Sequence, residues 1–480
     1  MTFEDAYRLS PELILGFFAI LIVLLDLGVR RKGWLAALTL VGLGASAAWT
    51  AVLTAGGWQG TALGDTLAVD NFSLFFKFLF LGAAALVVLA STGYSIRFAR
   101  FQGEYYALVL TSAAGMMLMA SGRELITLYI SLELTSLSLY ALAGFLKDPR
   151  SNEASLKYLL LGAISSAVLL YGMALLLGLT GETHLDAIAN ALGRMPGANY
   201  PVLFLGIIFI VTGFGFKIAA VPFQMWVPDV YEGSPTPVTA YLSVASKAAG
   251  FAITLRVFTL ALGGPREAAD WSLIFAILAV ASMTLGNILA IPQANIKRML
   301  GYSSIAQAGY LMVGLATLSD LGRSGIIFFL ASYAFTNLGA FIAVIAISHR
   351  IDSDLISDYA GMAHRSPLLA GALTFCLISL VGIPPTAGFI AKVYLFNAAV
   401  QQGLAWLVII AVVNSVISAY YYLGVVKAMF MGTPLSLERV TAVRPALAAL
   451  AVATVGVLVV GILPEPLISI AQAVGRSLIP

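Results

Sequence analysis

Charged residues are scarce in this chain. They make up 10% of its 480 residues, whereas hydrophobic residues make up 60%. A soluble domain carries about 25% charged residues, and the mean hydropathy here is +0.96. A large soluble core is excluded, because it would have no place for so much apolar surface. The composition therefore predicts an integral membrane protein.

Cysteine and histidine are nearly absent as well. The single cysteine, Cys376, can form no internal disulfide and supplies no CxxC-type metal site. With only three histidines besides, we expect the chain itself to hold no haem, iron–sulfur cluster or structural zinc. The chain starts with acidic residues, unlike the basic start of a cleavable signal peptide, so we expect its first apolar run to be a permanent span.

Long apolar runs are what the chain has in abundance. About 20 apolar residues cross a hydrocarbon core of roughly 30 Å. The predicted fold is therefore an all-α polytopic membrane protein with about fourteen transmembrane helices. These lie near residues 12–29, 34–54, 72–92, 104–120, 124–145, 155–179, 201–222, 237–262, 271–291, 300–318, 325–348, 367–399, 403–430 and 446–470.

Basic residues collect in one set of the predicted loops. Lys147, Arg150, Lys297 and Arg298 belong to this richer set, and loops rich in lysine and arginine face the cytoplasm. An even number of spans then places both termini on the opposite side. We expect a multi-pass protein of the bacterial inner membrane with both termini in the periplasm.

Two of the predicted spans are interrupted. Pro222 ends the seventh apolar run, and residues 382–385 (Gly-Ile-Pro-Pro) divide the twelfth. Proline removes a backbone hydrogen bond, and at membrane depth the freed groups must be covered by protein or face a cavity. Broken helices at corresponding places indicate transporter repeats. Spans 4–8 and 9–13 would form two five-helix repeats, inverted because their span number is odd. The predicted units are residues 1–100, 101–262, 263–430 and 431–480.

Four ionisable residues lie inside apolar runs: Glu133, Lys217, Lys247 and Lys392. Each charge costs roughly 2.5–3.5 kcal/mol at the centre of a membrane helix, and such residues commonly mark ion or proton paths. A buried ion pair that holds two helices together is the structural alternative. One acid cannot neutralise three lysines, however, and buried pairs are poor stabilisers. We therefore favour a proton relay over structural pairing.

Further polar residues are accessory candidates. Singly, each is more typical of an ordinary interhelical hydrogen bond, whereas as a stripe they are equally compatible with proton transfer. Lys157 could serve the cytoplasmic end of a pathway. Lys77, near Asp70, is expected to extend its ammonium to the membrane interface. The accessory candidates are Lys157, Ser243, Tyr302, Ser303, Gln307 and Tyr310.

Four sequence segments resemble a known family. They are GFGFKIAAVPFQMWVPDVYEGSPTPVTAYLSVASKAAGFA, EASLKYLLLGAISSA, QANIKRMLGYSSIAQAGY and GIPPTAGFIAKVYLF. In order and spacing they are similar to the antiporter-like membrane subunits of respiratory complex I and of Mrp-type cation/proton antiporters. The resemblance covers roughly residues 70–430.

The resemblance also implies a branch of the family and a role for each charge. M-type subunits are expected to carry a glutamate where this chain has Lys392, and L-type subunits continue into a long lateral helix. N-type subunits are expected to fit both Lys392 and the short segment that follows the fourteenth predicted span. Glu133 would tune the proton affinity of Lys217, Lys247 would be the central relay, and Lys392 would serve the periplasmic outlet. Some relatives carry a histidine where this chain has Gln307, and glutamine cannot take up a proton.

The function that the resemblance implies is proton translocation within NADH:quinone oxidoreductase, driven by quinone reduction elsewhere. The chain would be part of an enzyme without a redox centre of its own. Flavin, iron–sulfur clusters and quinone are expected in partner subunits. The partners would be other antiporter-like and small membrane subunits and the lipid bilayer, with no nucleic acid. Two alternatives stay open: a cation/proton antiporter subunit without redox coupling, and a structural scaffold with locked ion pairs.

Overall fold

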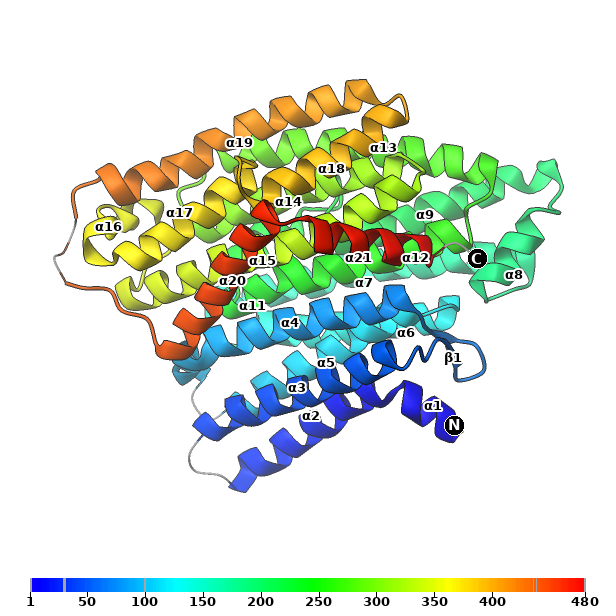
Figure 1. Cartoon of the computed structure of the whole chain (residues 1–480). Helices are drawn as coiled ribbons and strands as arrows, with labels where there is room; N and C mark the ends of the chain where they lie inside the picture. The colour runs from blue at the N-terminus through cyan, green and yellow to red at the C-terminus, as the bar shows by residue number, and fades with distance from the viewer. Residues whose placement is uncertain (1, 29–31, 99–100, 435, 437, 479–480) are drawn as a thin grey trace.

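The computed structural model describes residues 2–28, 32–98, 101–434, 436 and 438–478, and these form long helices with one short hairpin. The helices run along a common direction (Figure 1). The first half holds α1 Phe3–Arg8, α2 Ser10–Gly28, α3 Gly33–Ala55, α4 Asn71–Tyr94, α5 Gln102–Ser121, α6 Leu125–Ala143, α7 Pro149–Thr180, α8 Leu185–Leu192, α9 Tyr200–Ile218, α10 Trp226–Gly233, α11 Thr236–Tyr241 and α12 Lys247–Leu260. The second half holds α13 Pro265–Ala290, α14 Ile296–Ala316, α15 Asp320–Ile351, α16 Met362–Arg365, α17 Pro367–Val381, α18 Ala387–Gln401, α19 Ala405–Met431, α20 Arg444–Ile462 and α21 Glu465–Arg476.

The helical, multi-pass character predicted from the sequence is confirmed. Every predicted span coincides with a helix or with a pair of helices. Within the described residues, 11 helices are long and apolar enough to cross a membrane. Helices α5 and α14 are not among them, and the twelfth predicted span is divided into α17 and α18. Fourteen crossings therefore remain a prediction.

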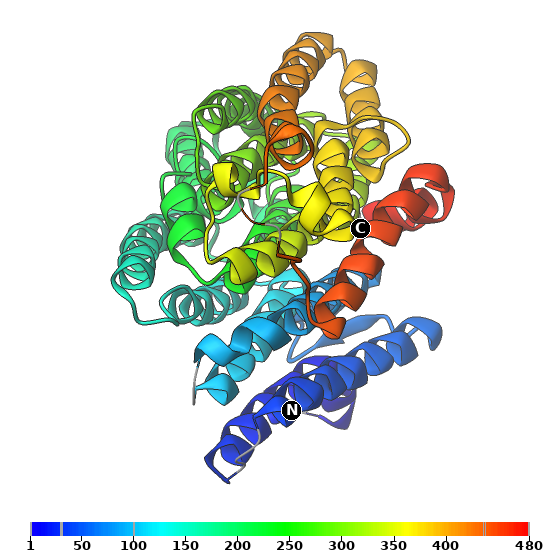
Figure 2. The same cartoon turned by 90° about the vertical axis from the view of Figure 1, so that its left-hand side faces the viewer.

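The helices differ in how deeply they lie in the bundle. In the continuous span Thr236–Leu260, α11 and α12 are joined by a π-helical turn, and every residue from Thr236 to Phe258 is buried. In the most apolar 18-residue stretch of α2 and of α19, only 33% of the residues are buried. Figure 2 shows the bundle nearly end-on, with α2 and α3 as an outer layer along one edge. The central span is the one that carries Lys247.

One end of the bundle carries both termini. The antiparallel hairpin of β1 (Gly60–Ala62) and β2 (Leu67–Val69) lies at this end beside α1, as does α8 (Figure 1). The opposite end carries Arg97, Arg150, Arg298 and Arg350 and is called the arginine-rich end below. Because the termini share one side, the placement agrees with an even number of crossings.

A buried arginine anchors α4 to the central span near the end of the bundle that carries both termini. The guanidinium of Arg256 donates to both carboxylate oxygens of Asp70 at 3.0 Å and to the carbonyl of Ala120 at 2.8 Å. Asp70 is also the N-cap of α4 and accepts from the backbone N–H of Ser73. Burial raises the pKa of Asp70, but the charge of Arg256 and these hydrogen bonds outweigh it and hold the pKa below its usual range.

The expectation that Lys77 reaches the membrane interface is wrong. Its side chain is 0% exposed, and its Nζ lies 2.8 Å from Oε1 of Glu12, which is itself buried on α2. Glu12 belongs to the acidic start of the chain, and the structure places it in the first turn of α2. The partner lies on a helix distant in sequence, so only the packing of α2 near α4 brings the two charges together.

Candidate functional site

The first break in the bundle follows Lys217 directly. Helix α9 ends where Ala219 adopts a left-handed backbone conformation, with φ 65°. The carbonyl of Phe216 accepts from the backbone N–H of Ala219 at 3.2 Å and from the indole of Trp226, at the start of α10, at 3.1 Å. Lys217 therefore lies in the last turn of α9, where the helix dipole favours a cation.

The contacts of Lys217 run through a hydroxyl. Its Nζ is buried and donates to Oγ of Ser136 on α6 at 3.0 Å. Glu133, half-buried on the same helix, accepts a hydrogen bond from Ser166 of α7. The carboxylate and the ammonium thus lie on neighbouring helices without forming a direct ion pair. Residues three apart share a helix face, so the spacing of Glu133 and Ser136 was a signal by which sequence analysis could have found this link.

Helices α9 and α12 approach closely at the two lysines. A Cβ atom on Gly250 of α12 would lie 2.9 Å from Cγ2 of Ile218 and 3.2 Å from Cγ of Lys217. Only glycine leaves room for this approach without displacing either side chain. Since Gly250 lies one turn after Lys247, the helices of both lysines are in direct contact here.

Lys247 lies immediately after the π-helical turn Leu242–Ser246, a local irregularity that is frequent at functional sites. Its Nζ donates to the carbonyl and to Oγ of Ser304 on α14. The centre of the Tyr333 ring lies 5.6 Å from the same Nζ, and the Tyr333 hydroxyl donates to Oγ of Ser304 at 3.2 Å. Ser304 therefore connects the central lysine to α15.

Lys392 binds to the end of the second broken helix. Helix α17 ends at Gly382, whose φ of 92° favours glycine, and α18 begins five residues later. The Nζ of Lys392 donates to the carbonyls of Leu380 and Val381 at 3.0 and 2.8 Å and to Oγ of Ser415 at 2.8 Å. The break frees these carbonyls, and the C-terminal end of a helix favours a positive charge.

A polar connection leads from the central lysine toward Lys392. The side chain of Gln307 donates to the carbonyl of Leu380 at 3.1 Å, and Lys392 binds to this same carbonyl. A cavity of about 10 Å³ between them is lined by Tyr333, Gln307 and Lys392 among others, which is room for about one water molecule. Tyr333 also contacts Ser304, so the polar groups form one row from Lys247 to Lys392.

The remaining accessory candidates separate into two groups. Ser243 accepts from Nδ2 of Asn337 at 2.7 Å, one turn before Lys247, and the ring of Tyr310 lies 4.5 Å from Nζ of Lys392. Tyr310 therefore contacts the row at Lys392, whereas Ser243 joins the span of Lys247 to α15 through Asn337. Ser303 instead contacts the hydroxyl of Tyr422, and Tyr302 is half-buried near the arginine-rich end.

Lys157 also lies apart from the row. Its Nζ binds to Glu153 at 2.8 Å and to Asp229 at 2.7 Å. Arg298 reaches Asp229 at 2.6 Å and Glu232 at 3.0 Å. Both acids lie on α10, and ion pairs tie this half of the broken helix to α7 and α14.

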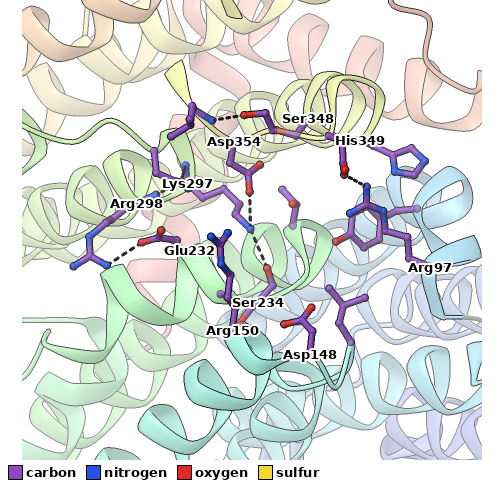
Figure 3. A pocket seen from close by; sticks show the side chains of 18 of the residues that line it. Arg97, Asp148, Arg150, Glu232, Ser234, Lys297, Arg298, Ser348, His349 and Asp354 are labelled. Atoms are coloured by element: carbon purple, nitrogen blue, oxygen red, sulfur yellow. Dashed lines mark hydrogen bonds and ion pairs between the residues drawn. The ribbon is translucent and has the colours of Figure 1, made fainter. Parts of the chain in front are cut away.

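A polar cleft of about 590 Å³ opens at the arginine-rich end. Figure 3 shows Lys297 in this cleft between Asp354 and Ser234, with Arg298 directed at Glu232. The Nζ of Lys297 lies 3.1 Å from Asp354 and donates to the carbonyl of Ser234 at 3.2 Å. Sequence analysis placed Lys297 in a loop, but it lies in the first turn of α14 and is 5% exposed. Ser304 follows two turns later, about 10 Å along the helix, so the cleft leads toward the central lysine.

Among the described residues, no group of three or more histidine, cysteine, aspartate or glutamate side chains is arranged to hold a metal ion. Cys376 is buried and free. The arrangement supplies amines, hydroxyls and carbonyls in a row, in which the amines and hydroxyls donate hydrogen bonds and the carbonyls accept them.

Known proteins share both the sequence and the fold. Residues 120–418 match the family described as NADH:quinone oxidoreductase/Mrp antiporter, transmembrane. The chain is 49% identical to NADH-quinone oxidoreductase subunit N of Dehalococcoides mccartyi over 476 residues, covering 96% of this chain and 97% of that one. It is 35% identical, with a TM-score of 0.81, to a chain of respiratory complex I from Thermus thermophilus with bound aureothin, covering 96% and 98%. A chain of the Mrp complex from Dietzia sp. has a TM-score of 0.86 at 21% identity, covering 100% and 98%, and shows the fold alone.

Proposed function

The chain belongs to the NADH:quinone oxidoreductase/Mrp antiporter family of membrane subunits, and from this premise we propose that it is the N-type, proton-translocating subunit of a bacterial NADH:quinone oxidoreductase. The observation that carries the proposal is the row of buried lysines across the bundle. Lys217 is bound to Ser136, Lys247 to Ser304, and Lys392 to the end of α17. Static ion pairs do not account for this row, because none of the three ammonium groups contacts a carboxylate among the described residues.

The proton pathway begins at Glu133. Energy from quinone reduction in partner subunits reaches this half-buried carboxylate and moves it relative to Lys217. A buried ammonium favours the neutral form once the carboxylate is removed, so the proton passes to Lys247 on the adjoining helix. Moving one charge through 100 mV takes about 2.3 kcal/mol, and a tenfold change in proton affinity supplies about 1.4 kcal/mol. Roughly two tenfold changes in the proton affinity of a lysine therefore match the work of moving one charge through 100 mV.

The second half of the pathway leads from Lys247 to Lys392. Ser304 and Tyr333 connect Lys247 to the small cavity in front of Gln307. Gln307 orients the carbonyl that Lys392 binds but does not itself carry a proton. Lys392 then releases the proton toward the periplasm. Tyr310 packs against Lys392, and Ser243 joins the span of Lys247 to Asn337 of α15. Lys157, Tyr302 and Ser303 belong to the surrounding structure.

The topology that fits this pathway has fourteen crossings. The arginine-rich end faces the cytoplasm and both termini face the periplasm. Residues 101–262 and 263–430 form two inverted repeats, each of which contains one broken helix. The order of elements supports this, since α9–α10 and α17–α18 occupy corresponding places five spans apart. Residues 1–100 and 431–480 flank the repeats.

The chain contributes to catalysis only as part of the translocase. Flavin, iron–sulfur clusters and the quinone site belong to partner subunits. Its neighbours in the bacterial inner membrane are other antiporter-like and small membrane subunits of the complex. Two relatives that are 49% and 46% identical to this chain are N subunits of NADH-quinone oxidoreductase, which favours this assignment over a cation/proton antiporter without redox coupling.

Gentle isolation of the native complex through a tag on this chain tests the assignment. We expect flavin, iron–sulfur clusters and NADH:quinone activity to co-purify, and the reconstituted complex to move protons when NADH is added. A complex that lacks redox groups and exchanges cations for protons would contradict the proposal and favour the antiporter alternative.

The hydroxyl of Ser304 is expected to matter for proton transfer. Ser304→Ala removes one acceptor of Lys247, and a hydrogen bond to a charged group is worth roughly 1.5–3 kcal/mol. Proton translocation should therefore slow by about ten-fold or more, measured as the initial rate of NADH-driven acidification in proteoliposomes. Ser303→Ala is the matched control, because this neighbouring hydroxyl contacts Tyr422 instead. Equal rates for the two variants would contradict a role of Ser304 in the relay.

A further inference from the structure

An apolar groove lies on the outer face of the bundle between α4, α15 and α20, away from the lysine row. It has a volume of about 400 Å³ and is lined by apolar residues, including Phe75, Phe78 and Phe335. Small residues between these rings, Gly82 and Ala334, leave it hollow. A Cβ atom on Gly82 would meet no atom within 4 Å, so the groove is open at this point.

A second cavity continues the groove toward the arginine-rich end. It has a volume of about 170 Å³ and lies between the same three helices. Along α4, the two cavities are one turn apart, from Leu86 to Ala90, which is about 6 Å. Along α15 they are two turns apart, from Leu338 to Ile345, which is about 10 Å. The two hollows therefore lie in line along the membrane-spanning direction, with the buried Val87 and Phe341 in the turns between them, and together they are called the crevice below.

The mouth of this crevice at the arginine-rich end is cationic. Arg350 lines it and is exposed. Its Nε donates to the carbonyl of Thr441 at 3.0 Å, and no described acid forms an ion pair with it. Nδ1 of His349, also in the lining, is buried and has no hydrogen-bond partner among the described residues. Arg444 begins α20 beside the mouth.

We propose that this crevice binds an anionic glycerophospholipid, with its phosphate at Arg350 and an acyl chain extending into the groove past Gly82. An apolar groove alone does not select an occupant in a membrane, because lipid tails are as apolar as its walls. The selection comes from the cationic mouth, since basic residues at the membrane surface attract anionic headgroups. A partner helix would fill the groove but would leave Arg350 without an anion and Nδ1 of His349 without a hydrogen-bond partner.

Photo-crosslinking in the intact, purified complex tests the groove. The probe is phosphatidylglycerol with a photoreactive group on its acyl chain, and labelled peptides are mapped by mass spectrometry. We expect labelling of residues 75–86 and 331–338. Gly82→Phe fills the groove and should remove most of this labelling. Gly44→Phe is the matched control, because Gly44 is equally exposed on α3 and its Cβ would also meet nothing within 4 Å.

A second pair of variants tests the headgroup. Arg350→Gln should lower the preference for phosphatidylglycerol over phosphatidylcholine about five-fold, the contribution of one basic side chain near an anionic surface. Arg365→Gln is the control, since Arg365 makes a similar bond to the carbonyl of Glu438 but does not line the crevice. The proposal would be overturned by unchanged labelling in Gly82→Phe or by an unchanged lipid preference in Arg350→Gln. It would also be overturned if a photoreactive residue placed at position 78 crosslinked to another subunit.

Discussion

Replacing Lys247 by alanine is expected to stop proton translocation through this subunit while the complex still assembles. Lys247 lies in the most deeply buried span and contacts Ser304, so no other described amine occupies its place between Lys217 and Lys392. A positioned acid–base group contributes about 100-fold or more to proton transfer. The measurement is the number of protons moved per NADH oxidised in proteoliposomes, with assembly checked on native gels.

Lys247→Arg distinguishes a relay from a structural cation. Arginine keeps the positive charge and the capacity to donate to Ser304, but it does not release a proton at physiological pH. A structural role would be rescued by arginine, whereas a relay would not. Lys427→Ala serves as the control, because Lys427 is exposed near the end of α19. Wild-type proton stoichiometry in assembled Lys247→Ala or Lys247→Arg complexes would rule out the relay.

Removing one partner of the buried Glu12–Lys77 pair is expected to destabilise the protein strongly. The pair joins α2 to α4, and apart from each other its charged atoms have no hydrogen-bond partner among the described residues. Glu12→Leu would leave the fully buried ammonium of Lys77 uncompensated, which costs about 3–5 kcal/mol. The measurement is the melting temperature of the purified complex and the amount of this subunit in the membrane.

The double variant Glu12→Leu/Lys77→Met is the control for this experiment. Replacing both charges by apolar side chains of similar volume is often neutral or stabilising, so we expect stability close to that of the unaltered protein. Proton translocation should also be retained, because the pair lies outside the lysine row. A double variant as unstable as Glu12→Leu would show that the site requires the ions themselves.

The sequence was informative where a charged residue is costly to place in an apolar run, or where proline removes a backbone hydrogen bond. Lys217, Lys247 and Lys392 were identified because a charge in an apolar run needs a compensating environment. The breaks after Lys217 and at Gly382 were predicted from proline and glycine, and the structure has both. The helices coincide with the apolar runs because length and hydropathy are local properties of the chain.

The partners of these charges were not predictable in the same way. Ser304 and Tyr333 meet Lys247 from two different helices, and many other spans carry similar hydroxyls. Lys77 was misjudged because its counter-charge, Glu12, lies two helices earlier in the chain. In a membrane protein, lipid-facing and protein-facing surfaces are both apolar, so the pattern along one helix does not reveal its neighbours.

The sequence by itself determined that this chain spans a membrane, that its helices break at two places, and that Lys217, Lys247 and Lys392 lie inside apolar spans. Each of these follows from the cost of a charge or a missing hydrogen bond in an apolar run. Only the tertiary structure decided that Lys217 binds to Ser136 of α6, and that the end of α17 receives Lys392. These contacts join segments distant in sequence, and they depend on which helices pack together.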